Sequence, residues 1–245
     1  MLFVGAHPGD VLLGASWLLR RSPGAHVVHV ADAPPRLLTV GPGGRFPSSA
    51  PVLPRQEESF RALALAGLPW EHLLSLGAPA QQAILSLVPL TECLMALLKA
   101  LRPTLLVGPP YAGEDPDEDA AAFISHAAVA LMMRAGRTPP VLLEMVGAPR
   151  LPDQPQPETT VSFTEAEHAA KQRMLACYGS RGGEWKGLLT HRERYRLAPR
   201  YDFTRPPREG PLPYEASERD VTGSSWRTWA RQALEELKLL ETPWH

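Results

Sequence analysis

Cysteine is scarce in this chain. Only Cys93 and Cys177 occur among its 245 residues, and the sequence pattern places them in separate predicted helices. Two isolated cysteines form neither a disulfide framework nor a zinc site built from thiolates. Any metal-binding site in this protein must therefore use histidine and carboxylate side chains.

An excess of charge of either sign is also lacking. The 25 basic and 26 acidic residues give a net charge of -1, without the basic footprint that holds phosphate backbones. We find no apolar run of the roughly 18 residues that cross a bilayer, and no charged leader with a cleavage site. We expect no nucleic-acid partner, no membrane association and a cytoplasmic location.

The pattern of apolar segments indicates an α/β protein. Residues 1–5, 25–31, 72–76, 104–108 and 142–146 read as short buried strands, and helices are predicted near 11–20, 55–68, 89–101, 117 onward and 164–178. This alternation is typical of a Rossmann-like fold, with a mostly parallel sheet flanked by helices. We expect one α/β domain over residues 1–180 and a C-terminal extension, 181–245, packed on it.

Two loops that follow predicted strands carry chemically useful side chains. In the first, His7 and Asp10 offer zinc-ligand types at a spacing that lets a tight turn aim both at one point. In the second, every residue from Glu114 to Asp119 except Pro116 is a carboxylate. Both loops lie at the edge where α/β sheets bind ligands. Asp10 could equally cap a helix, and the acidic run could be a solvated loop.

Both loops resemble motifs of the PIG-L/LmbE family of metal-dependent N-deacetylases. Residues 6–14, Ala-His-Pro-Gly-Asp-Val-Leu-Leu-Gly, are similar to its opening motif, Ala-His-Pro-Asp-Asp-Glu followed by a glycine. Residues 111–120, Tyr-Ala-Gly-Glu-Asp-Pro-Asp-Glu-Asp-Ala, fit its Tyr-x-Gly-Gly-His-Pro-Asp-His-Asp-Ala motif without a gap. The resemblance extends over residues 171–181 and parts of 193–227.

The resemblance implies roles for individual residues. It makes His7, Asp10 and Glu118 the metal ligands, with Asp115 as a displaced general base, because Gly9 stands where the family has its base. The family metal is zinc, although two carboxylates and one imidazole shift the preference toward Mn, Fe, Mg or Ca, and an empty site is the alternative. Arg55 resembles a substrate-facing arginine; otherwise it forms an exposed ion pair with Glu58.

His126 would become the third ligand in another register of the second motif. It lies about 12 Å along the predicted helix from Glu118 at ~1.5 Å per residue, so we expect it in the core or on the helix surface.

Two functions are compatible with these residues. One is a metal-dependent amide hydrolase that removes an acetyl group from an N-acetylated sugar or related small molecule. Its chemistry would be altered or weakened, because loss of a general base typically costs ~10²–10⁴ in rate. The other is a catalytically degenerate relative that acts as a binding or scaffold protein. The sequence leaves open whether the chain is an enzyme, and it does not determine the oligomeric state.

Overall fold

We analysed a computed structural model of the chain, which describes residues 1–32, 54–146, 159–179, 191–216 and 221–240. The last two residues of the motif-like segment 171–181 lie outside the described residues.

A seven-stranded sheet forms the centre of the molecule, with the strand order β3-β2-β1-β4-β5-β7-β6. The strands β1 to β5 are parallel, whereas β7 is antiparallel to both β5 and β6. This arrangement confirms the predicted Rossmann-like, mostly parallel sheet. The strands are β1 (Leu2–Gly5), β2 (His26–His29), β3 (Leu73–Ser75), β4 (Leu105–Gly108), β5 (Val141–Val146), β6 (Thr159–Ser162) and β7 (Arg192–Leu197).

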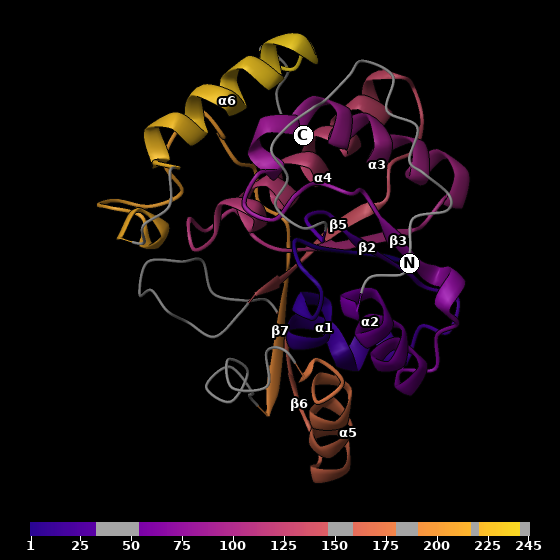
Figure 1. Cartoon of the computed structure of the whole chain (residues 1–245). Helices are drawn as coiled ribbons and strands as arrows, with labels where there is room; N and C mark the ends of the chain where they lie inside the picture. The colour runs from indigo at the N-terminus through magenta and orange to yellow at the C-terminus, as the bar shows by residue number, and fades with distance from the viewer. Residues whose placement is uncertain (33–53, 147–158, 180–190, 217–220, 241–245) are drawn as a thin grey trace.

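Helices cover both faces of the sheet. Figure 1 shows α3, α4 and α6 on one face and α1, α2 and α5 on the other. The α-helices are α1 (Asp10–Arg20), α2 (Pro54–Leu65), α3 (Leu87–Leu101), α4 (Pro116–Arg134), α5 (Glu165–Leu175) and α6 (Gly223–Glu236). A capping box starts α5, because Thr164 and Glu167 exchange both of its hydrogen bonds.

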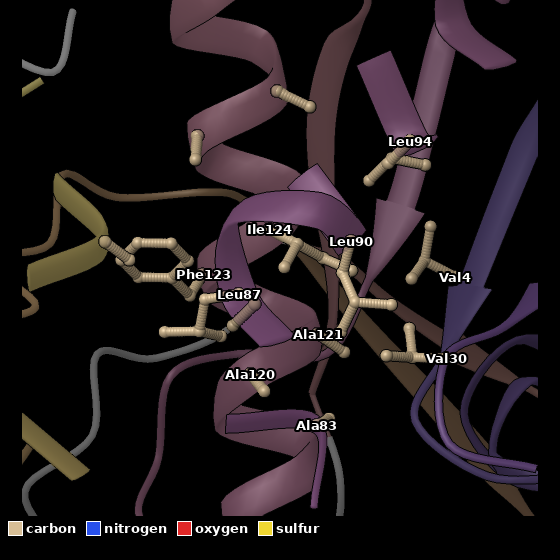
Figure 2. Close-up of a cluster of buried hydrophobic side chains, with 14 of the residues drawn as sticks. Val4, Val30, Ala83, Leu87, Leu90, Leu94, Ala120, Ala121, Phe123 and Ile124 are labelled. Carbon is tan, nitrogen blue, oxygen red and sulfur yellow. The ribbon is translucent and has the colours of Figure 1, made fainter. Parts of the chain in front are cut away.

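The two faces of the sheet bury separate hydrophobic clusters. Side chains alternate along a strand, so Leu2 and Val4 enter the cluster under α3, α4 and α6, whereas Phe3 enters the cluster under α1, α2 and α5. In the first cluster, Leu90 and Leu94 of α3 lie against Val4 (Figure 2). The leucine side of this helix is thus part of the core.

One segment is more apolar than we expected from the sequence. The 19 residues Ala83–Leu101, which include α3, have a mean hydropathy of 1.8 and are long and apolar enough to cross a membrane. The expectation that no stretch reaches this length was therefore wrong. However, Leu87, Leu94 and Leu98 in this segment pack into the core.

Helix α1 is kinked, and a buried ion pair satisfies the backbone groups at the kink. Ala15 has the non-helical angles φ -145° and ψ 27°. Glu193 of β7 accepts hydrogen bonds from the backbone nitrogens of Ser16 (2.8 Å) and Trp17 (3.0 Å). Lys171 of α5 donates to the Leu13 carbonyl and lies 2.9 Å from Glu193. The hydrogen bonds and the ion pair at the kink therefore connect α1 to α5 and β7.

In the C-terminal region, the described residues 191–216 and 221–240 contribute to the sheet and to the core. Its strand β7 lies between β5 and β6. Its helix α6 packs against α3, and the buried indole of Trp226 donates to the carbonyl of Pro116 (3.2 Å) and stacks on Tyr111. This segment supplies an inner strand in addition to packing on the α/β domain.

Candidate functional site

The candidate site lies at the topological switch point of the sheet. From β1, the chain order proceeds to β2 and β3 on one side and to β4 and β5 on the other. Ligands bind at the carboxyl ends of strands at such a point in open α/β sheets. The loop after β1 brings His7 there, and the loop after β4 brings Asp115 and Asp117, as predicted.

His7 lies between two carboxylates. Its Nε2 is 3.0 Å from Oδ2 of Asp117, and its Nδ1 is 3.7 Å from Oδ2 of Asp10. Asp117 is fully buried and also accepts hydrogen bonds from the backbone nitrogens of Gln81 (2.5 Å) and Ala83 (3.1 Å). Since an ionised carboxylate only accepts, Nε2 of His7 is the donor to Asp117.

The start of helix α1 places Asp10 toward His7. Gly9 is the N-cap residue, and Asp10 is the first residue of the helix. The Asp10 carboxylate accepts a hydrogen bond from the backbone nitrogen of His7 (2.6 Å). The alternative in which Asp10 caps α1 is therefore wrong. Gly9 has φ +101°, a left-handed conformation that L side chains rarely adopt.

Asp115 begins helix α4. Its Oδ1 accepts hydrogen bonds from the backbone nitrogens of Asp117 (2.8 Å) and Glu118 (3.4 Å), and Pro116 is the first helical residue. This is the N-cap geometry expected of an aspartate followed by proline. The predicted start near Asp117 is correct within one residue, and the acidic first turn faces the positive end of the helix dipole.

The many carboxylates alter the ionisation of the site. Burial opposes protonation of His7, but its hydrogen bond to Asp117 and the negative charges of Asp10, Asp115 and Asp117 outweigh this effect and raise the pKa of His7 to about 9. Burial, together with the charges of Asp10 and Asp115, raises the pKa of Glu118 to about 8. The pKa values show that negative charge is poorly compensated here, a condition that a bound cation would relieve.

The structure brings together some of the predicted site residues. The group of three potential ligands around His7, with atoms within 4.8 Å of one another, consists of His7, Asp115 and Asp117. Asp10 also contacts His7, whereas Glu118 interacts with His7 and Asp10 electrostatically. The roles proposed for Glu118 and Asp115 stay predictions.

The sequence points to two further residues, Arg55 and His126. Arg55 lies in α2, but its side chain is outside the description, so its substrate-binding role stays a prediction. His126 is buried beside Tyr201, in keeping with a core position. Asp117 has no role in the site that the sequence predicts, although it lies between the two altered motif positions, Asp115 and Glu118.

The donor set around His7 fits a divalent cation. Ligand atoms about 2.0–2.2 Å from one zinc ion lie roughly 3.4 Å apart across a tetrahedral angle. The 3.7 Å between His7 Nδ1 and Asp10 Oδ2 is close to this value. A carboxylate that accepts from the other ring nitrogen, as Asp117 does, is the usual partner of a metal-binding histidine. The oxygen-rich set also suits Mn, Fe or Mg.

Comparison with solved structures defines the class of fold. No family model matches the sequence, and comparison with curated proteins gives no match. Solved structures do match, and they show that the chain has the α/β fold of PIG-L/LmbE-like N-deacetylases at low sequence identity.

Three of these structures illustrate the range. The zinc-inhibited form of teicoplanin deacetylase Orf2 is 16% identical, with a TM-score of 0.52 over 74% of this chain and 84% of that one. N,N'-diacetylchitobiose deacetylase from Pyrococcus horikoshii is 15% identical, with a TM-score of 0.55 over 81% and 83%. GalB, the 4-carboxy-2-hydroxymuconate hydratase of Pseudomonas putida KT2440, is 14% identical, with a TM-score of 0.55 over 82% and 97%. The fold therefore serves more than one reaction.

Proposed function

We propose that this chain is a metal-dependent hydrolase that removes an acetyl group from an N-acetylated sugar or a related small amide. The observation that supports it most directly is the setting of His7. Its Nε2 is held by buried Asp117 while its Nδ1 lies 3.7 Å from Asp10, at the switch point of a fold found in N-deacetylases. This is the arrangement of a histidine prepared to bind a metal ion.

The residues would divide the chemistry among them. His7 and Asp10 would hold the cation, with Glu118 as the third ligand by position in the motif. A divalent cation supplies a Lewis acid for the amide carbonyl and an activated water. Asp117 orients the imidazole, and Asp115, which has a carboxylate oxygen within 4.8 Å of a ring nitrogen of His7, would replace the missing base. Arg55 would bind substrate hydroxyls.

The rate should be lower than that of a fully equipped deacetylase. Gly9 has no side chain to act as a base, and Asp115 and Glu118 stand where the family has histidines. Loss of a positioned base typically costs ~10²–10⁴ in rate, and loss of an oxyanion donor ~10²–10³.

A second candidate function is a binding or scaffold role without catalysis. It is favoured by the backbone at Gly9, whose φ of +101° makes an aspartate costly at the position of the family base.

The test combines metal analysis with an activity assay. The purified chain is incubated with Zn, Mn, Fe or Co, bound metal is determined by elemental analysis, and acetate release is followed with N-acetylglucosamine and N,N'-diacetylchitobiose. We expect His7→Ala to lower bound metal by one ion per chain and to abolish acetate release. The control is His26→Gln, at the opposite end of the parallel strands.

The possible results separate the two functions. Acetate release that requires His7 supports the hydrolase. Metal uptake without acetate under any ion supports the binding protein, and unchanged metal content in His7→Ala contradicts the metal site itself.

A further inference from the structure

A second group of metal-ligating side chains lies where helix α5 approaches strand β7. Glu165 and His168 belong to α5, and His191 directly precedes β7. One ligand atom from each residue lies within 4.8 Å of the other two. Figure 1 shows α5 at the β6–β7 end of the sheet, and none of these three residues belongs to the group around His7.

Hydrogen bonds position the backbone of this group. The capping box of Thr164 and Glu167 starts α5 at Glu165, and residues three apart on a helix share one side, as Glu165 and His168 do. The carbonyl of His191 accepts from the backbone nitrogen of Phe163 (2.8 Å), one residue before the cap. These hydrogen bonds therefore fix the backbone of Glu165, His168 and His191 relative to one another.

The two imidazole rings lie against each other. The ring centroids of His168 and His191 are 3.6 Å apart, and the planes differ by 17°. Nε2 of His168 is buried, and among the described residues it has no hydrogen-bond partner. Burial and the neighbouring His191 lower the pKa of His168. A buried ring nitrogen without a partner is costly unless a further group satisfies it.

We propose that Glu165, His168 and His191 bind one divalent transition-metal ion of the zinc, cobalt, nickel or copper class. Two imidazoles and one carboxylate are a common ligand set for such ions and leave a coordination position for water. The ligand atoms lie within 4.8 Å of one another, and the side chains of Glu165 and His191 are exposed. Because the lone pairs of stacked rings are nearly parallel, His191 would rotate out of the stack on His168 to bring the atoms to the roughly 3.4 Å that ligands around one ion require. The ion would join the start of α5 to the start of β7.

The experiment isolates this site from the one at His7. The full chain carrying His7→Ala is titrated with Co²⁺ and with Zn²⁺, using calorimetry and the visible absorption of bound cobalt. We expect one ion per chain, cobalt absorption typical of nitrogen and oxygen ligands, and a higher Tm in the presence of zinc. Mg²⁺ should have no effect, because imidazole ligands do not suit it.

Ligand variants test the assignment. In the same background, His168→Gln, His191→Gln and the exposed Glu165→Gln should each weaken binding by about tenfold or more and remove the Tm shift. The matched control is His72→Gln. His72 stacks on His26 with centroids 4.3 Å apart, but among the described residues this pair belongs to no three-ligand group.

Two results would overturn the proposal. One is the absence of binding at millimolar Zn²⁺ and Co²⁺; the other is binding that His191→Gln and Glu165→Gln leave unchanged. If His7→Ala fails to fold, Asp10→Asn replaces it as the background. The titrations use a chain in which the His7 site has already been removed. Their result therefore does not depend on whether the proposed hydrolase activity exists.

Discussion

The backbone conformation of Gly9 determines where Asp10, a proposed metal ligand, is placed. The left-handed φ of +101° lets the loop after β1 turn Asp10 back toward His7. A side chain in the left-handed region costs roughly 1–2 kcal/mol. The sequence shows the glycine, but only the structure shows that restoring an aspartate at this position would also strain the loop.

We predict that Gly9→Ala destabilises the protein by about 1–2 kcal/mol, because alanine is strained at this φ. Urea unfolding measures the change. The control is Gly24→Ala, where an added Cβ meets nothing within 4 Å and φ is not positive. Equal stabilities of the two variants would contradict the prediction.

Asp119 makes stability depend on pH. It is buried, and burial raises its pKa from 3.8 to about 7, although Gly113 and Ala112 donate hydrogen bonds to it. The folded state thus holds a proton that the unfolded state releases near pH 4. This bound proton contributes fully to the stability of the fold below that pH, and its contribution is lost as the pH rises through about 7.

We therefore expect Asp119→Asn to reduce the loss of stability between pH 5 and pH 8, by roughly 2–3 kcal/mol. Chemical denaturation at the two pH values measures it, in chain freed of metal. The exposed Glu57→Gln is the control and should leave the difference unchanged. An unaltered pH dependence in Asp119→Asn would show that this carboxyl is not responsible.

At the scale of elements, the kink in α1 depends on residues that are distant in the sequence. Glu193 accepts from Ser16 and Trp17, and Lys171 supplies the opposite charge. The apolar pattern predicted α1 and the helix containing Lys171 correctly. It could not reveal the kink, because the groups that satisfy the opened backbone come from α5 and β7.

We predict that Lys171→Met destabilises the protein by roughly 3–5 kcal/mol, because it leaves the buried charge of Glu193 without its partner. The double variant Lys171→Met with Glu193→Gln should recover part of this loss, since no buried charge then remains. Guanidinium unfolding of the single and double variants gives the coupling. A double variant as unstable as the sum of both single changes would contradict the ion-pair account.

At the scale of the whole molecule, the C-terminal region completes the sheet. β7 lies between β5 and β6, and α6 contributes Trp226, Ala230 and Leu234 to the core beside α3. The sequence predicted a boundary near residue 180. The structure shows that a chain cut there would leave β6 without its partner and one side of α3 uncovered.

We expect the fragment 1–180 to lack cooperative unfolding, and Trp226→Ala in the full chain to cost about 3–5 kcal/mol. Thermal unfolding followed by circular dichroism measures both. The exposed Trp229→Ala is the control and should change stability by less than about 0.5 kcal/mol. A fragment that unfolds cooperatively would show that residues 1–180 are an independent domain.

The succession of strands and helices, the two loops of the candidate site, and the proximity of His7 to Asp10 could all be predicted from the sequence. These depend on local signals: apolar periodicity, caps, and the spacing of side chains along one turn. The folded chain reveals three features that the sequence did not: Asp117 accepts a hydrogen bond from His7, β7 is an inner strand, and His168 stacks on His191. Such contacts join residues far apart in the chain, and their geometry depends on how the sheet and helices pack together.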